Sequence, residues 1–133
     1  GYTFCPDVCP VDVGRTMAGL KRFEAASPDR AAKVQPLFIS VDPERDTPAV
    51  LREFTDQFHP RLIGMTGSKE QLDKVTKQFA AQYSLGEKNE EGGYLVNHTS
   101  ITYLFGPDGE PIAILPTDAG PDAVAAELDK WVR

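Results

Sequence analysis

Apolar residues follow helical spacing near the start of the chain and a strand-like pattern after it. Between residues 13 and 23 the apolar positions are four, three and three residues apart, which predicts a helix that ends near Ser27. The apolar run 34–41 is rich in β-branched and aromatic residues and predicts a buried strand. Pro36 lacks a backbone N–H donor, so it is expected near the start of this strand or on a sheet edge.

Two helix start signals lie in the middle of the chain. Thr47 followed by Pro48 predicts an N-cap and a first helical residue. Ser68 with Gln71 three residues later predicts a capping box. Apolar spacing of three and four residues extends this second helix as far as Tyr83.

The rest of the chain predicts short strands, turns and a last helix. Short strands are expected at 62–65, 101–105 and 112–115. The sequence GPDG at 106–109 is a hairpin signal between the last two strands. Gly120 followed by Pro121 opens the last helix. Residues 86–93 (GEKNEEGG) fit no periodic pattern and are expected to form a mobile polar loop.

This order of elements predicts an α/β domain in which helices cover a mixed sheet. We expect a single domain over residues 1–133, because this length is typical of one domain. Residues 1–4 precede the two cysteines and are enough for the tail end of a strand only. Since alternating α/β folds usually begin with a strand, the first strand of the sheet is expected to be missing or truncated.

The composition and net charge of the chain limit the kinds of molecule that it is expected to bind. The chain is 41% hydrophobic and 26% charged, as in ordinary globular domains. Its formal net charge of -6 argues against nucleic acid or an anionic membrane surface as the main partner. No stretch approaches the roughly 18 apolar residues of a spanning helix, and no signal-peptide pattern is present. The sequence begins at Gly1 rather than Met, so we expect a soluble piece of a longer protein.

The two cysteines are the first candidate functional residues. Cys5 and Cys9 have the spacing C-x-x-x-C and are followed by Pro10. Because the residue before a proline avoids helical dihedrals, Cys9 is expected to be the N-cap and Pro10 the first helical residue. Both sulfurs then lie at a helix N-terminus, where free backbone donors and the helix dipole favour thiolate over thiol. Such a pair either binds a soft metal such as Cu(I) or Zn(II) or forms a reversible disulfide.

A metal site needs a further ligand, and the chain has two histidines. His59 precedes Pro60 at a predicted helix end and is expected to be a capping or surface residue. His98 lies between the 86–93 loop and the strand at 101–105, at the kind of junction where sites are often built. His98 is therefore the favoured nitrogen ligand.

Three motifs, in this order, resemble those of the Sco/SenC proteins. GYTFCPDVCP at 1–10 resembles the metal-binding motif of that family. FISVDPERDTP at 38–48 resembles its second signature, and YLVNHT at 94–99 resembles the signature that carries the histidine. The resemblance runs from Gly1 to the last helix.

The resemblance implies a thioredoxin-like, three-layer α/β fold with a mixed β-sheet flanked by helices. It implies one copper ion, Cu(I) or Cu(II), held by Cys5, Cys9 and His98, with the same two cysteines able to form the redox disulfide. The implied function is that of a copper metallochaperone which assembles the dinuclear copper-A site of cytochrome c oxidase. Subunit II of the oxidase is then the main partner, and other copper chaperones or thiol reductases are further partners.

The resemblance also implies a cellular location. Members of the family are usually tethered to a membrane by an N-terminal segment. We therefore expect the domain on the periplasmic side of the bacterial inner membrane, or in the mitochondrial intermembrane space, with membrane contact only through such a tether.

Other residues of the same motifs are expected near the copper ligands without binding the metal. Asp42 follows a predicted strand, at the sheet edge where α/β sites gather. Asn97 stands where the family usually has Asp, and Asn can hydrogen-bond but adds no negative charge. Asp46 precedes Thr47 and is expected to belong to a helix cap. Arg45 is a lesser candidate, for a cationic contact with a partner.

Two redox activities remain as alternatives: a thiol-disulfide oxidoreductase that reduces partner cysteines, and a peroxidase-like enzyme on the same fold. Thioredoxin-type reductases have C-x-x-C and a cis-proline on the facing strand, whereas this chain has C-x-x-x-C and His98, Thr99 and Ser100 at that place. A peroxidase would need only one of the two cysteines and would not need His98. The spacing therefore favours metal binding over disulfide exchange.

Overall fold

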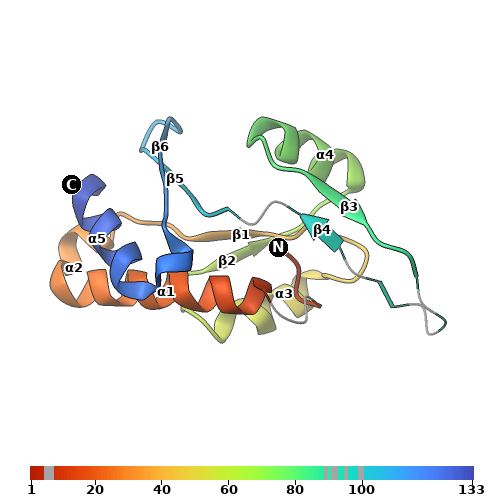
Figure 1. The fold of residues 1–133 in the computed structure, drawn as a ribbon, viewed down its shortest axis with the longest axis horizontal. Helices are drawn as coiled ribbons and strands as arrows, with labels where there is room; N and C mark the ends of the chain where they lie inside the picture. The colour runs from red at the N-terminus through yellow and green to blue at the C-terminus, as the bar shows by residue number, and fades with distance from the viewer. Residues whose placement is uncertain (5–7, 89, 91–92, 95, 99–100) are drawn as a thin grey trace. The chain divides into compact units, whose positions relative to one another are not determined.

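The structure is a computed structural model of the chain (Figure 1). It describes residues 1–4, 8–88, 90, 93–94, 96–98 and 101–133, and only the backbone at 8, 9, 97 and 98. The chain forms two compact units. Gly1–Pro10 and Pro36–Ser100 make up the first unit, and Val11–Gln35 and Ile101–Arg133 make up the second.

The first unit carries the two middle helices and four short strands among its described residues. In chain order these are β1 (Leu37–Ile39), α3 (Pro48–Asp56), β2 (Ile63–Met65), α4 (Lys69–Gln78), β3 (Tyr83–Leu85) and β4 (Val96–His98). Strand β1 pairs with β2 in parallel, with Phe38 opposite Gly64. Strand β3 pairs with β4 in antiparallel fashion, with Tyr83 opposite His98.

Helix α3 packs closely on the β1–β2 pair. A Cβ atom on Gly64 would lie 3.0 Å from Cβ of Leu51, so glycine permits this approach of strand and helix. The rings of Phe38 and Phe54 lie 5.1 Å apart, between centroids, in the same contact. The Thr47 hydroxyl accepts a 3.3 Å hydrogen bond from the Val50 N–H and caps α3 as predicted.

The N-terminal segment lies along the edge of β1 that faces away from β2. The Gly1 amino group donates to the Ile39 carbonyl at 3.2 Å, and the Val41 N–H donates to the Gly1 carbonyl at 2.8 Å. On the other edge, the Ser40 N–H donates to the Met65 carbonyl of β2. The segment that leads to the cysteines is therefore fixed on the backbone of β1.

The second unit is built from two helices that pack together, a hairpin and short helical turns. Its elements are α1 (Val8–Ala26, which begins in the first unit), α2 (Pro28–Ala31), β5 (Tyr103–Phe105), β6 (Pro111–Ile114), η1 (Thr117–Ala119) and α5 (Pro121–Trp131). The predicted hairpin is confirmed: β5 pairs with β6, and Gly109 takes φ +83°, which favours glycine. Met17, Leu20 and Phe23 of α1 and Val124 and Leu128 of α5 are buried. Helix α1 approaches α5 closely at Gly19, where a Cβ atom would lie 2.6 Å from Cβ of Val124.

Three element boundaries differ from those that the sequence predicts. Helix α1 begins at Val8, so Cys9 and Pro10 lie inside its first turn rather than at the N-cap and first position. The missing N–H of Pro10 costs nothing there, because the first four N–H groups of a helix have no partner within the helix. The strand expected at 34–41 is only β1, and Pro36 directly precedes it.

The largest difference concerns the end of α4 and the strand after it. Tyr83 was expected in this helix but lies in β3, because the chain turns at Ala80, a non-glycine residue with φ +53°. The β3–β4 hairpin was not foreseen. The mobility expected of the 86–93 loop stays a prediction, since residues 89, 91 and 92 lie outside the described part. None of the helices in the described ranges is both long and apolar enough to cross a bilayer.

Candidate functional site

The three predicted copper ligands lie at the margins of what the structure describes. Cys5 lies outside the described residues, Cys9 is in the first turn of α1, and His98 is the last residue of β4. The side chains of Cys9 and His98 are not described, so the ligand set stays a prediction. Within the described positions no group of three or more His, Cys, Asp or Glu could hold a metal ion.

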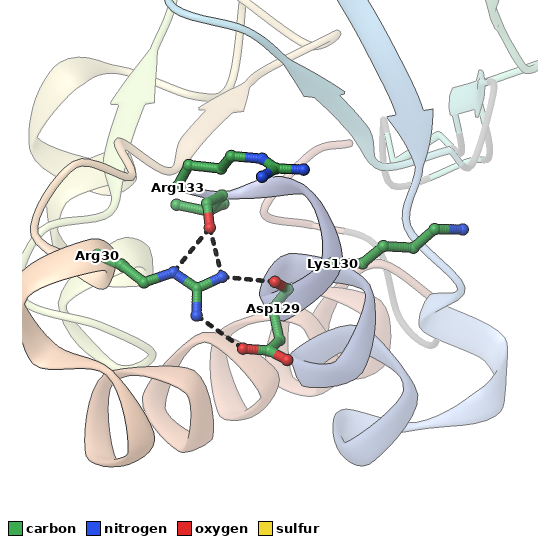
Figure 2. A pocket seen from close by; sticks show the side chains of 5 residues that line it. Arg30, Asp129, Lys130 and Arg133 are labelled. Carbon is green, nitrogen blue, oxygen red and sulfur yellow. Dashed lines mark hydrogen bonds and ion pairs between the residues drawn. The ribbon is translucent and has the colours of Figure 1, made fainter.

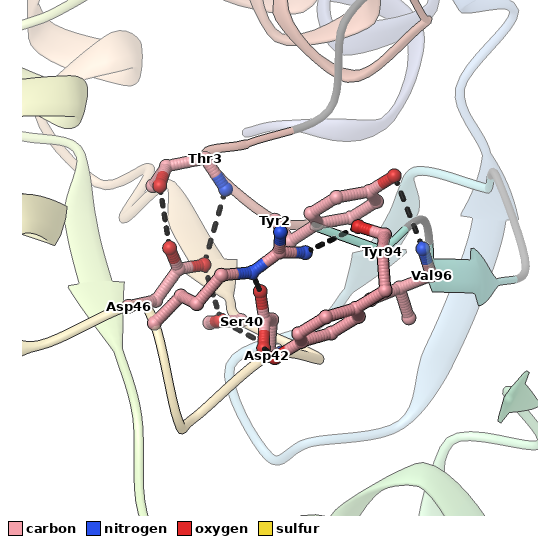
Figure 3. A network of polar contacts seen from close by, with 8 residues as sticks. Tyr2, Thr3, Ser40, Asp42, Asp46, Tyr94 and Val96 are labelled. Atoms are coloured by element: carbon pink, nitrogen blue, oxygen red, sulfur yellow. Dashed lines mark hydrogen bonds and ion pairs between the residues drawn. The ribbon is translucent and has the colours of Figure 1, made fainter. Parts of the chain in front are cut away.

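A network of polar contacts surrounds the segments that lead to these ligands (Figure 3). The Asp46 carboxylate is fully buried and accepts hydrogen bonds from the Thr3 N–H at 3.0 Å, from the Thr3 hydroxyl, and from the Ser40 hydroxyl at 2.6 Å. Asp46 was expected to belong to a helix cap, but Thr47 caps α3 and the Asp46 carboxylate binds Thr3 and Ser40. Asp46 instead holds Thr3, two residues before Cys5.

Asp42 is the second buried carboxylate of the network, 1% exposed. Its Oδ1 accepts a 2.7 Å hydrogen bond from the Tyr94 hydroxyl, and its Oδ2 accepts one from Nε of Arg45. Its backbone N–H donates to the Ser40 hydroxyl at 3.0 Å. Asp42 thus ties the loop after β1 to Tyr94, four residues before His98.

Arg45 lies among the aromatic residues of two different motifs. Its guanidinium carbon lies 3.7 Å from the ring centroid of Tyr94, 4.9 Å from that of Phe4 and 5.8 Å from that of Tyr2. Its Nη2 donates a 2.8 Å hydrogen bond to the Tyr94 carbonyl. Burial alone would lower the pKa of Arg45, but the hydrogen bond and the charge of Asp42 outweigh it and raise the pKa above its usual value.

Tyr2 joins the N-terminal segment to β4. Its side chain is 2% exposed and packs with Val41, Leu72 and Val96 in a buried cluster. Its hydroxyl accepts a 3.2 Å hydrogen bond from the Val96 N–H. Figure 3 shows this contact on the side of the network away from Asp46. Tyr2 lies three residues before Cys5, and Val96 lies two residues before His98.

Tyr83 of β3 and Tyr94, which precedes β4, both have raised pKa values. Burial, and next the hydrogen bond to Asp42, raise the pKa of Tyr94 to about 12. The hydrogen bond to Asp73 on α4, and next burial, raise the pKa of Tyr83 to about 12. Each hydroxyl donates a hydrogen bond to a carboxylate, and the raised pKa keeps that donor protonated to a higher pH than in an exposed tyrosine.

Each unit also has a hollow in its surface. The hollow in the second unit, of about 330 Å³, is lined by Arg30 and the end of α5 (Figure 2). Arg30 donates to the Asp129 carboxylate at 2.8 Å and to the Val132 carbonyl at 2.8 Å, so it anchors the C-terminal segment and is not free to bind an anion. A hollow of about 520 Å³ in the first unit borders Asp42 and Tyr94.

His59 also differs from expectation. It is 3% exposed, and its Nδ1 accepts a 3.0 Å hydrogen bond from the Arg61 N–H. It is thus a buried residue that shapes the turn before β2, not a surface residue. Sequence reasoning passed over Tyr2, Thr3 and Tyr94, and the available signal was that they lie inside the motifs at 1–10 and 94–99.

Comparisons with known proteins place the chain in one family. The family model described as SCO1/SenC matches residues 1–133. The bovine mitochondrial protein SCO2 homolog is 44% identical over 109 residues, which are 82% of this chain and 40% of the relative. Protein SenC of Rhodobacter capsulatus is 42% identical over 125 residues, which are 94% of this chain and 54% of the relative. The chain spans about half or less of these relatives.

A solved structure carries the same fold. The structure of ScoI from Bradyrhizobium japonicum with copper bound aligns with a TM-score of 0.87 at 34% identity, over 99% of this chain and 81% of the other. This similarity confirms the predicted thioredoxin-like α/β fold, with a small sheet flanked by helices. The match over the full chain and the relatives agree with the three motifs, and the chain belongs to the SCO1/SenC family.

Proposed function

We propose that this chain is a copper metallochaperone domain that binds one copper ion through Cys5, Cys9 and His98. In this proposal it delivers copper for the copper-A site on subunit II of cytochrome c oxidase. The observation that carries the proposal is the 3.2 Å hydrogen bond from the Val96 N–H to the Tyr2 hydroxyl.

This contact limits how far apart the ligands can lie. An extended chain spans at most about 3.6 Å per residue, so the Cα of Cys5 is within about 11 Å of that of Tyr2. By the same rule the Cα of His98 is within about 7 Å of that of Val96. The contact between Tyr2 and Val96 brings the segment before Cys5 next to the segment before His98, which supports a site shared by the two segments.

The donor chemistry favours copper. Two thiolates and an imidazole suit Cu(I) and can adapt to Cu(II), whereas harder ions prefer carboxylate oxygens. The buried carboxylates nearby, Asp42 and Asp46, already accept hydrogen bonds at both oxygens. The soft ligands are thus the ones left for a metal, and the copper-bound structure of a relative supports this choice.

Asp42 and Asn97 are assigned supporting roles in the proposed site. Asp42 holds the Tyr94 hydroxyl and so orients the chain that leads to His98. Asn97 precedes His98 in β4 and adds no charge beside the imidazole. Residues 1–133 act as one domain in this proposal. We place it in the bacterial periplasm or the mitochondrial intermembrane space, where other copper chaperones or thiol reductases load and reduce it.

A copper titration tests the ligand set. Cu(I) and Cu(II) binding is measured on the reduced wild type, on Cys9→Ser and on His98→Ala, with Ser84→Ala as a control on the exposed face of the same hairpin. The wild type and Ser84→Ala should bind one copper and show a thiolate-to-Cu(II) absorption band. Each ligand variant should lose the band and at least about tenfold in affinity. Unchanged binding by His98→Ala would overturn the three-ligand proposal.

The redox alternatives use the same sulfur atoms. Oxidation of Cys5 and Cys9 to a disulfide removes two electrons and two protons, and it should block Cu(I) uptake. Reduction of insulin disulfides at thioredoxin-like rates would favour a thiol-disulfide oxidoreductase. Rapid consumption of peroxide by a single-cysteine variant would favour a peroxidase instead.

A further inference from the structure

We infer that Arg45 is a positioning residue for the copper site, because it ties the segment that leads to Cys5 to the segment that leads to His98. The part of this inference that concerns copper rests on the proposed function. The tie itself is independent of any metal. The motif at 38–48 would then serve as the joint between the two motifs that carry the ligands.

The contacts of Arg45 reach both segments at once. On one side its guanidinium carbon lies 4.9 Å from the Phe4 ring centroid and 5.8 Å from that of Tyr2. On the other side it lies 3.7 Å from the Tyr94 ring centroid and donates a 2.8 Å hydrogen bond to the Tyr94 carbonyl. One planar cation therefore contacts rings on both segments, an arrangement in which each ring face attracts the charge.

Asp42 fixes the orientation of this cation. Its carboxylate accepts from Nε of Arg45 and also from the Tyr94 hydroxyl, so Asp42, Arg45 and Tyr94 close a ring of contacts. Asp42 is 1% exposed, and the Arg45 side chain is 20% exposed. A buried charge that loses its partner is strongly destabilising, so the pair is held together.

A lysine at this position would reproduce only part of the arrangement. The guanidinium offers several N–H donors in a fixed plane, and here Nε and Nη2 serve different acceptors while the face lies over a ring. An ammonium group keeps the charge near Asp42 but does not satisfy both acceptors in one plane. Graded effects of Arg45→Lys and Arg45→Met are therefore expected.

Positioning matters because a copper ligand set must be assembled from separate segments. When the segments are already held together, less conformational freedom is lost on binding. Besides Arg45, the described contacts between the N-terminal segment and the 94–96 segment include the hydrogen bond between Tyr2 and Val96. Removal of Arg45 should loosen residues 94–98 relative to the N-terminal segment and weaken copper binding.

The first test uses metal-free protein. Amide hydrogen exchange is followed at residues 94–98 in the wild type, Arg45→Lys, Arg45→Met and Arg52→Met, the last being a matched control at an exposed position of α3. Exchange of the Val96 amide should accelerate about tenfold or more in Arg45→Met, less in Arg45→Lys and not in Arg52→Met. If the Val96 amide exchanged as slowly in Arg45→Met as in the wild type, the inference that Arg45 ties the two segments together would be wrong.

The second test adds copper to the same proteins. Arg45→Met should lose about tenfold or more in copper affinity and shift the thiolate-to-Cu(II) band, and Arg45→Lys should recover part of both. A lowered melting temperature with unchanged affinity and absorption would reduce Arg45 to a structural residue and overturn the inference. If the wild type binds no copper, the proposed function fails, while hydrogen exchange still decides whether Arg45 ties the segments.

A double variant covers the case in which Arg45→Met does not fold. Asp42→Asn with Arg45→Met removes both charges, so no unpaired carboxylate remains buried. This variant still lacks the tie, and it should show the same fast exchange of the Val96 amide. Slow exchange in the folded double variant would contradict the inference.

Discussion

The hydroxyl of Tyr94 donates a 2.7 Å hydrogen bond to Oδ1 of Asp42, a carboxylate that is 1% exposed. The two residues are 52 positions apart in the sequence. The contact connects the loop after β1 to the chain that enters β4. It therefore ties this loop to the segment that precedes His98.

Tyr94→Phe tests the energetic weight of this contact. The variant keeps the ring beside Arg45 and removes one donor from a buried carboxylate, which should lower the free energy of unfolding by about 1–3 kcal/mol. Urea unfolding measures the change. Tyr103→Phe is the control, because the Tyr103 hydroxyl makes no hydrogen bond within the described part of the chain, and it should change stability by less than about 0.5 kcal/mol. Equal effects of the two variants would contradict the contact.

The perturbed tyrosines predict a loss of stability at high pH. The pKa of Tyr94 rises from 10.0 to about 12 in the fold, so the unfolded chain loses this proton first as the pH rises. The stabilisation is fully present below about pH 10 and is lost as the pH approaches about 12. The free energy of unfolding, measured in urea at about pH 9 and about pH 11, should fall in the wild type and fall less in Tyr94→Phe. An identical fall in both proteins would exclude Tyr94 as a source.

Asp46→Asn tests the anchor of the N-terminal segment. Asp46 accepts hydrogen bonds from Thr3 and Ser40, and an amide nitrogen in place of one oxygen would face a donor. The free energy of unfolding should fall by about 2–4 kcal/mol. Asp56→Asn at the exposed end of α3 should change it by less than about 0.5 kcal/mol. A small effect of Asp46→Asn would show that Thr3 is held by other contacts.

Local signals in the sequence were sufficient for the starts of α3 and α4. Thr47 and Ser68 cap their helices as predicted, because a cap depends only on residues within one turn. The hairpin at Gly109 was predictable for the same reason, since its turn needs a positive φ. These elements depend on interactions between residues that are close together in the sequence, so they can be predicted from the sequence alone.

Features that depend on distant partners were not predictable in this way. The apolar position of Tyr83 fits the helical spacing of α4, but its pairing with His98 in the β3–β4 hairpin outweighs that periodicity. The position of Asp46 just before Thr47 and Pro48 indicated a helix cap, but its carboxylate accepts hydrogen bonds from Thr3, 43 residues away. The candidate ligands could be predicted from sequence motifs. The polar network that holds the segments around them could be identified only from the three-dimensional structure.

Gly19→Ala tests the contact between α1 and α5 in the second unit. Helix propensity alone predicts that alanine at an interior helical position stabilises the protein by about 1 kcal/mol. A Cβ atom on Gly19 would, however, lie 2.6 Å from Cβ of Val124 and 2.9 Å from the Pro121 carbonyl oxygen. Because neither atom can move without shifting α5, we expect a net loss of about 1–3 kcal/mol in the free energy of unfolding. Thermal and urea unfolding measure it, and a stabilised variant would show that the two helices are not packed this closely.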